Sequence, residues 1–247
     1  MNKKVVLVTG AGSTIGKSLI PKLLDAGYSV LAQVRHVDAQ LANMAADSSE
    51  RLRLLAVDLR SDELGSIVAE AIANGSWMIS GLIHLPSAPL KLEPLPRTYL
   101  YDLRSHMDVA VYSLHAIISS LWKAIRKSED FRLIAVNTSA ICSALPPKGM
   151  TPYLVSKGAL TPYLRCVESE LRNAKVTVNQ ISPDMFRSPL IDALPAYVVE
   201  QFAGGVSENN EKSNAIDPNK DIVPTIMFLL SPDARKITGA NILITRT

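Results

Sequence analysis

The sequence predicts an α/β fold: a single domain of the Rossmann type, with a doubly wound parallel sheet of about seven strands and helices on both faces. Two observations support this prediction. Short β-branched and aliphatic runs alternate with longer amphipathic stretches along the chain, which is the pattern of successive β-α units. A glycine-rich segment also lies between the first expected strand and the first expected helix, where nucleotide-binding folds carry their phosphate-binding turn.

Strands are expected where a short apolar run ends at turn-forming residues, and helices where apolar residues recur every three or four positions. The expected strands are 4–8, 28–34, 52–57, 77–84, 131–137, 176–181 and 241–245. The expected helices are 17–26, 61–74 with Ser61 as N-cap, 103–127, 151–171 and 221–230. From about 185 to 218 the pattern is lost, and its place after the sixth strand indicates a mobile lid over the substrate cleft.

Composition narrows the class of protein. The chain has 247 residues, 47% of them hydrophobic, and a net charge of +3, which is too mild to indicate a nucleic-acid partner. No apolar run approaches the ~18 residues of a membrane-spanning helix. The two cysteines, Cys142 and Cys166, form neither a disulfide framework nor a metal-binding pattern. We therefore expect a soluble cytoplasmic protein with no membrane, nucleic-acid or metal partner.

The glycine-rich turn is the first candidate site. Gly10 would permit a tight turn, Gly12 would let the backbone approach a pyrophosphate, and Gly16 would let the helix pack against the strand. The phosphates would lie on the free amides of the helix N-terminus. The spacing is one residue longer than the usual dinucleotide fingerprint, and a purely structural role of the glycines is the alternative. The expected cofactor-binding residues here are Gly10, Gly12, Ser13, Thr14, Ile15 and Gly16.

The second and third strands indicate which cofactor would bind. In dinucleotide folds an acidic residue after the second strand binds the adenosine ribose, whereas an arginine accommodates a 2′-phosphate. Here that strand ends at Val34 and is followed by Arg35, without a carboxylate, so NADP(H) is favoured over NAD(H). A solvated arginine is the alternative. Asp58 and Leu59, at the end of the third strand, are expected beside the adenine.

Tyr153 and Lys157 are the candidate reactive pair. Four residues apart on the expected helix 151–171, they project from the same face. A neighbouring ammonium stabilises a phenolate, so we expect Lys157 to lower the pKa of Tyr153 and prepare it for acid-base catalysis. Ser139, at the carboxyl end of the fifth strand, faces the cleft where ligands of open α/β sheets bind. The alternative is a half-buried tyrosine stacked on a lysine stem.

Several of these features together resemble one known family. They are Thr9-Gly10 with Gly16, Asp58, Ser139, Tyr153-x-x-x-Lys157, the segment Val178-Asn179-Gln180-Ile181-Ser182-Pro183 and Ile237-Thr238-Gly239. With them the chain resembles the short-chain dehydrogenase/reductase family over nearly its whole length.

The resemblance implies roles for particular residues. Tyr153 would be the general acid or base, Lys157 would bind the nicotinamide ribose, and Ser139 would hydrogen-bond the substrate oxygen. Pro183 and Ser188 would lie at the nicotinamide end of the cofactor. The family pairs its subunits through the long helix and the tyrosine-bearing helix, which implies a homodimer or homotetramer.

The chain departs from the family pattern at several positions. Thr14 replaces the central glycine of the turn, and Asp184 replaces the glycine after Pro183. Ala110 replaces the asparagine that holds a water for proton relay, with His106 one turn earlier as a substitute or as a surface histidine. His84 begins the segment that replaces the family's Asn-Asn-Ala-Gly, and it either contacts the cofactor ribose or is a satisfied strand-end histidine.

The main functional hypothesis is an NADP(H)-dependent oxidoreductase that transfers hydride between nicotinamide and a small-molecule carbonyl or alcohol. The eroded motifs support a second hypothesis, a nucleotide-binding or scaffold protein with weakened catalysis. A sugar-nucleotide epimerase or dehydratase is less favoured, because those enzymes usually need a larger C-terminal substrate domain than 247 residues allow.

Overall fold

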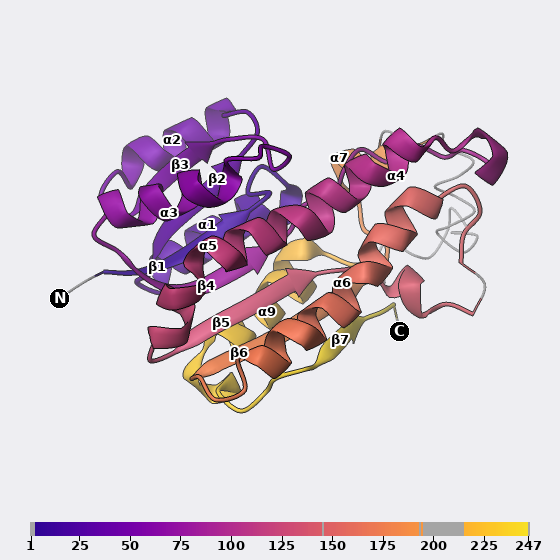
Figure 1. Ribbon diagram of the computed structural model, residues 1–247. Coiled ribbons are helices and arrows are strands. Elements are labelled where there is room, and N and C mark those ends of the chain that lie inside the picture. Colours follow the sequence, from indigo (N-terminus) through magenta and orange to yellow (C-terminus); the bar gives the residue numbers. More distant parts are fainter. Residues whose placement is uncertain (1–2, 145, 193, 195–214, 247) are drawn as a thin grey trace.

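A computed structural model describes residues 3–144, 146–192, 194 and 215–246. Seven strands form one parallel sheet in the order β3-β2-β1-β4-β5-β6-β7 (Figure 1). The order reverses between β1 and β4, which lie side by side at the centre. The strands are β1 Lys4–Thr9, β2 Ser29–Val34, β3 Leu52–Ala56, β4 Met78–His84, β5 Phe131–Val136, β6 Val176–Pro183 and β7 Asn241–Ile244.

Helices pack on both faces of the sheet (Figure 1). One apolar core joins the sheet to α1, α2 and α9, and a second joins the opposite face to α3, α5 and α6. The helices are α1 Thr14–Asp25, α2 Ala39–Asp47, α3 Leu64–Asn74, α4 Leu100–Met107, α5 Ser113–Lys127, α6 Thr151–Glu170, α7 Pro189–Asp192 and α9 Val223–Leu230.

Strand β1 shows why a continuous apolar run is needed at the centre of such a sheet. Its side chains alternate between the two faces: Val6 and Val8 enter the first core, while Val5 and Leu7 enter the second. All four are fully buried. A parallel strand covered on both sides has no face left for polar residues, and the predicted doubly wound architecture is therefore confirmed.

The strands match the sequence prediction to within two residues, but several helices differ. Helix α3 begins at Leu64 rather than just after Ser61, and its N-cap position is held by Glu63 without a side-chain hydrogen bond. Ser61 instead accepts from the Glu63 amide in the preceding turn. Helix α2 was not predicted, because Leu41 is its single buried residue. Its capping residue Asp38, which accepts from the Leu41 amide, was the available signal.

The expected helix 103–127 is interrupted. Helix α4 already begins at Leu100, and a wider π-helical turn over Asp108–Tyr112 separates it from α5, although the three segments run on as one rod (Figure 1). A π turn breaks the regular ladder of backbone hydrogen bonds. Here the Ala110 carbonyl accepts from the buried His84 ring instead.

The expected lid at 185–218 is described only at its two ends. Residues 193 and 195–214 lie outside the described residues, while the segment before them carries the short helix α7. Within the described part of the chain, no helix combines the length and apolar character needed to cross a membrane.

Candidate active site

A cavity of about 1110 Å³ lies at the carboxyl ends of the central strands. This is the edge at which the strand order reverses, and open α/β sheets bind their ligands there. The expected site residues that line it are Gly10, Gly12, Ser13, Thr14, Ile15, Arg35, Asp58, Leu59, Ser139, Tyr153, Lys157, Pro183 and Ser188. Gly16 is the expected site residue that does not line it.

The glycine-rich turn forms one wall of the cavity. Gly10 has a positive φ of 68°, and a Cβ there would come within 3.0 Å of the Pro86 nitrogen. Gly16 packs inside the turn, where a Cβ would lie 2.4 Å from the Ala11 carbonyl oxygen. Around Gly12, by contrast, a Cβ would meet no protein atom within 4 Å. Gly10 and Gly16 are therefore required by the turn itself, and Gly12 is the glycine whose surroundings are open.

A buried glutamine fixes this turn to the neighbouring strands. The Gln33 side chain accepts from the Gly10 amide at 2.9 Å and donates to the Val57 carbonyl at 2.7 Å. Nearby, Arg35 is exposed at the cavity rim after β2. Asp58 is paired with Arg60, which lowers the pKa of the Asp58 carboxyl to about 2. This end of the cavity thus holds one ion pair and, in Arg35, a further cation.

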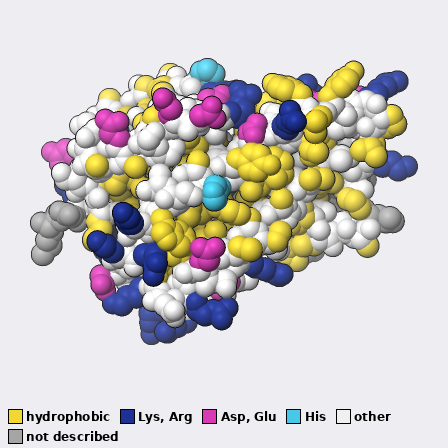
Figure 2. All heavy atoms as spheres, in the orientation of Figure 1, with side chains coloured by type: hydrophobic (Ala, Val, Ile, Leu, Met, Phe, Trp, Pro, Cys, Tyr) yellow, Lys and Arg dark blue, Asp and Glu magenta, His cyan; other side chains and the backbone are white. Residues whose placement is uncertain are grey.

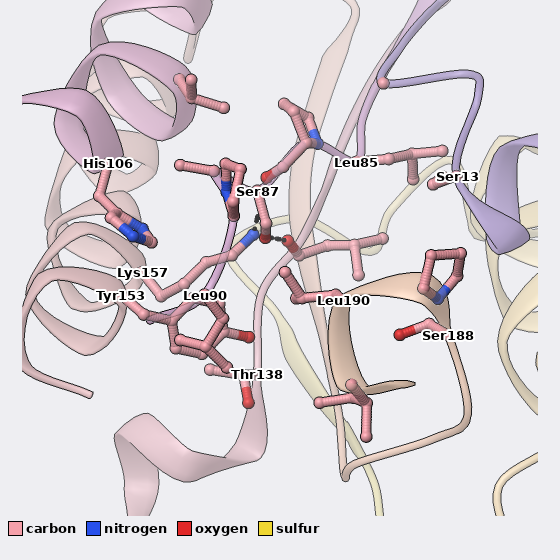
Figure 3. A pocket seen from close by; sticks show the side chains of 18 of the residues that line it. Ser13, Leu85, Ser87, Leu90, His106, Thr138, Tyr153, Lys157, Ser188 and Leu190 are labelled. Carbon is pink, nitrogen blue, oxygen red and sulfur yellow. Dashed lines mark hydrogen bonds between the residues drawn. The ribbon is translucent and has the colours of Figure 1, made fainter. Parts of the chain in front are cut away.

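Lys157 is buried and bound to two strand ends. Its ammonium donates to the carbonyls of Val136, at 2.9 Å, and Pro86, at 3.1 Å. Val136 ends β5 and Pro86 follows β4, so this one side chain ties α6 to both strands (Figure 3). Burial lowers the pKa of Lys157 to about 8. An ammonium has three protons, which leaves one for a group within the cavity.

Tyr153 differs from expectation in its pKa. Burial raises the pKa of Tyr153, and the Thr138 side chain is the influence that opposes this rise. The predicted lowering of this pKa by Lys157 is wrong, because burial of the phenol is the largest influence on it and raises the pKa. Figure 3 shows the Tyr153 and Thr138 side chains together in the pocket. Thr138 was missed in the sequence, although it directly precedes Ser139.

Ser139 has a different partner. Its hydroxyl donates to the carboxylate of Asp184, the residue that stands where the family pattern has glycine. The other carboxylate oxygen of Asp184 accepts from the Arg246 amide at 3.2 Å. The structure therefore places Ser139 at the cavity, as expected. Its hydroxyl proton points to Asp184, the residue directly after β6.

His84 is a fully satisfied buried histidine. Its Nε2 lies 2.9 Å from the Ala110 carbonyl oxygen and its Nδ1 lies 2.8 Å from the Thr9 hydroxyl. Since a carbonyl can only accept, Nε2 carries the proton and Nδ1 accepts from Thr9. Burial lowers the pKa of His84 to about 3. Of the two interpretations left open by the sequence, the structure supports the satisfied strand-end histidine.

His106 is not a surface residue. It is 6% exposed, lines the cavity, and packs edge-on against the Tyr153 ring with 6.3 Å between the ring centroids. Burial lowers the pKa of His106, and the Pro89 backbone opposes this shift. The sequence-based preference for a surface position is wrong, because α4 turns this side toward α6 and the loop after β4 (Figure 3).

Comparison with known proteins identifies the family to which the chain belongs. A family model described as enoyl-(acyl carrier protein) reductase matches residues 10–245, nearly the whole chain. The chain belongs to the short-chain dehydrogenase/reductase family. Its members are oxidoreductases.

Curated members of the short-chain dehydrogenase/reductase family match at modest identity. Estradiol 17-beta-dehydrogenase 2 of Mus musculus is 28% identical over 94% of this chain, which spans 62% of the mouse protein. The 3-oxoacyl-[acyl-carrier-protein] reductase FabG of Staphylococcus aureus is 25% identical over 97% of this chain and 95% of that protein. A probable NADP-dependent dehydrogenase of Haemophilus influenzae is 24% identical, covering 93% and 88% of the two chains.

Solved structures share the fold of this short-chain dehydrogenase/reductase. A 3-ketoacyl-(acyl-carrier-protein) reductase from Brucella melitensis, complexed with NADH, superposes with a TM-score of 0.83 at 19% identity, covering 99% of this chain and 97% of that one. ElxO with NADP bound superposes with a TM-score of 0.81 at 18% identity, covering 99% of this chain and 98% of that one.

Among the described residues, no group of three or more His, Cys, Asp or Glu side chains is placed to hold a metal.

The buried His84 predicts a pH dependence of stability. An unfolded chain protonates this histidine below about pH 6.5, whereas the folded protein resists protonation down to about pH 3. The unfolded state then binds more protons, so the free energy of unfolding should fall as the pH drops through this window, by up to about 5 kcal/mol.

Urea unfolding between pH 6.5 and 4 measures this slope. His84→Asn should flatten it, whatever its absolute stability, while exposed His36→Asn is the matched control and should keep the wild-type slope. Equal slopes for His84→Asn and the wild type would contradict the assignment.

Proposed function

We propose that this short-chain dehydrogenase/reductase is an NADP(H)-dependent oxidoreductase that interconverts a carbonyl and an alcohol. One observation carries the proposal: the phenol of Tyr153 and the ammonium of Lys157 line the same cavity as the glycine-rich turn. The cavity therefore combines a proton donor (Tyr153), a cation (Lys157) and a wall suited to phosphate. Its volume is large enough for a dinucleotide and a small substrate.

The residues present fit a nicotinamide dinucleotide. The first-turn amides of α1, at Thr14 and Ile15, lie at the cavity, where helix N-terminal amides bind phosphate. The open space around Gly12 leaves room for the pyrophosphate, and the remaining proton of Lys157 would bind a ribose hydroxyl. Arg35 would hold a 2′-phosphate, which supports NADP(H) over NAD(H). When bound, the cofactor supplies or accepts a hydride.

Tyr153 would supply the proton. Its raised pKa keeps the phenol protonated around neutral pH, which suits it to donate to a carbonyl oxygen as hydride reaches the carbonyl carbon. Alcohol oxidation needs the phenolate instead and would gain with rising pH. Carbonyl reduction is therefore the direction that the neutral-pH site supports best.

The substrate end of the cavity is apolar. Leu90, Met150, Ile191 and Leu194 form a small separate core, against which Tyr153 packs. Three of these residues, Leu90, Met150 and Ile191, also line the cavity. Apolar walls favour apolar ligands in proportion to the area that they cover. We propose that the carbonyl substrate carries an apolar group that faces this wall.

The relatives support this assignment by their names. One is described as an NADP-dependent dehydrogenase and another as a 3-oxoacyl reductase. Solved structures of the same fold include one complexed with NADH and one with NADP. We propose from these names that this chain uses a nicotinamide cofactor and acts on a carbonyl or an alcohol. We assign it no particular substrate.

We also propose a cytoplasmic homodimer or homotetramer. Figure 2 shows hydrophobic side chains gathered over the region where α4, α5 and α6 run in Figure 1. Large apolar residues exposed on or beside these helices would be covered in an oligomer. They are Tyr99, Leu100, Tyr101, Tyr112 and Val155.

A binding or scaffold protein with weakened catalysis is the second candidate. Two observations favour it: the Ser139 hydroxyl is engaged by Asp184, and the Ala110 carbonyl is engaged by His84. NADPH binding without carbonyl reduction across a broad panel of ketones and aldehydes would favour this candidate over the enzyme.

Replacing the phenol of Tyr153 tests the proposed chemistry. Tyr153→Phe should lower the rate of carbonyl-dependent NADPH oxidation about 10²- to 10⁴-fold, the usual contribution of a positioned proton donor, while NADPH binding persists. The control is Tyr163→Phe on the same helix, outside the cavity and bonded to His115, which should keep the wild-type rate. Unchanged turnover in Tyr153→Phe would exclude this mechanism.

The cofactor preference is tested at Arg35. Arg35→Ala should weaken NADPH binding about 10- to 100-fold, the value of a lost hydrogen bond to a charged group, and should leave NADH binding unchanged. Fluorescence titration with both nucleotides measures the two constants. Exposed Arg97→Ala, away from the cavity lining, is the matched control. Equal effects on NADPH and NADH would refute a 2′-phosphate contact.

A further inference from the structure

We propose that Asp184 sets the substrate specificity of this site, because it turns the Ser139 hydroxyl into a hydrogen-bond acceptor toward the cavity. The substrate that fits is a ketone or aldehyde with a hydroxyl or amino group close to its carbonyl. The inference rests on the proposed function and deepens it, since it names the class of substrate that the same cavity would take. It reverses the donor role that the family resemblance gave to Ser139.

The single proton of Ser139 is already used. The Ser139 hydroxyl donates to the Asp184 carboxylate, and a serine hydroxyl has one proton and two lone pairs. Hydrogen bonds to an ionised acceptor are about twice as strong as those to a neutral one, so a neutral substrate carbonyl would not draw this proton away. Because Ser139 lines the cavity, it offers the substrate its lone pairs rather than a proton.

Asp184 is held in place from the end of β7. Its backbone amide donates to the Ile244 carbonyl at 2.8 Å, and its second carboxylate oxygen accepts from the Arg246 amide at 3.2 Å. The Arg246 guanidinium in turn donates to the Met185 carbonyl at 3.2 Å. These contacts fix the carboxylate before a substrate arrives, so that Asp184 needs no rearrangement to hold the Ser139 proton.

The oxygens of these two side chains select the kind of substrate group. Asp184 also lines the cavity and is partly exposed, so Ser139 and Asp184 present neighbouring accepting oxygens. A hydroxyl or amino group of the substrate can donate to them, whereas an ether or a second carbonyl would bring only further lone pairs. The reacting carbonyl oxygen is left to Tyr153, which lines the same cavity and donates the proton in the proposed reaction.

A matched pair of substrates isolates the donated proton. A hydroxymethyl ketone and the corresponding methoxymethyl ketone, with the same linear alkyl chain, differ in that only the first can donate. The alkyl chain suits the apolar wall of the cavity in both. NADPH oxidation should show a kcat/KM about 10-fold higher for the hydroxymethyl ketone, the usual value of one hydrogen bond.

Variants assign this preference to the two residues. Ser139→Ala should bring the ratio of the two kcat/KM values close to one, by slowing the hydroxymethyl ketone. Asp184→Gly, which restores the glycine of the family pattern, should also lower the ratio, but by speeding the methoxymethyl ketone, because Ser139 regains a proton to donate. Asp184→Ala should do the same without the added backbone freedom of glycine. Exposed Asp233→Ala, away from the cavity lining, is the matched control and should keep the wild-type ratio.

Two results would overturn the inference. One is an equal ratio in the wild type and Ser139→Ala. The other is a larger loss on the methoxymethyl ketone than on the hydroxymethyl ketone in Ser139→Ala, which a proton-donating serine would give. Both comparisons stand even where an Asp184 variant does not fold.

A binding measurement separates this inference from the proposed function. If the wild type reduces no carbonyl, the proposed function fails, and saturation-transfer NMR then compares the binding of the same two ketones to the protein. Tighter binding of the hydroxymethyl ketone that is lost in Ser139→Ala would support the acceptor role of Ser139, and equal binding of the two ketones would refute it.

Discussion

The buried ammonium of Lys157 is the interaction on which the site depends. It crosses from α6 to the ends of β4 and β5 and donates to one carbonyl at each. Removing a charge from water is costly unless hydrogen bonds compensate, and the lowered pKa of Lys157 reflects that cost. Because those carbonyls are offered only where parallel strands end, α6 is fixed at the edge of the sheet that carries the cavity, with Tyr153 one turn away from Lys157.

The sheet explains why this edge also carries a crevice that suits the proposed nucleotide. Strand order reverses between β1 and β4, so the connections that follow these two strands diverge to opposite faces and leave a crevice. The glycine-rich turn enters that crevice from β1, and Gln33 pins it to the neighbouring strands. His84, at the end of β4, hydrogen-bonds the Thr9 hydroxyl of β1 and the Ala110 carbonyl of the π turn, and so joins these two elements.

Periodicity was sufficient to predict the strands and most helices, because a sheet covered on both faces demands long uninterrupted apolar runs. Spacing was likewise sufficient to bring Tyr153 and Lys157 together. The features that the sequence did not reveal depended on burial and on distant partners. The pKa of Tyr153 rises because its surroundings are apolar, and Ser139 is engaged by Asp184, 45 positions away. Neither the position of Thr138 beside Tyr153 in the cavity nor the burial of His106 has a local sequence signal.

The most direct test observes the Lys157 ammonium itself, by ¹⁵N NMR of lysine Nζ groups with Lys157→Met to assign the signal. We expect a slowly exchanging resonance that titrates near pH 8, below the ordinary lysine value of about 10.4, and that shifts when NADPH saturates the protein. A Lys157 signal that titrates with the exposed lysines and ignores NADPH would contradict a site organised around this buried charge.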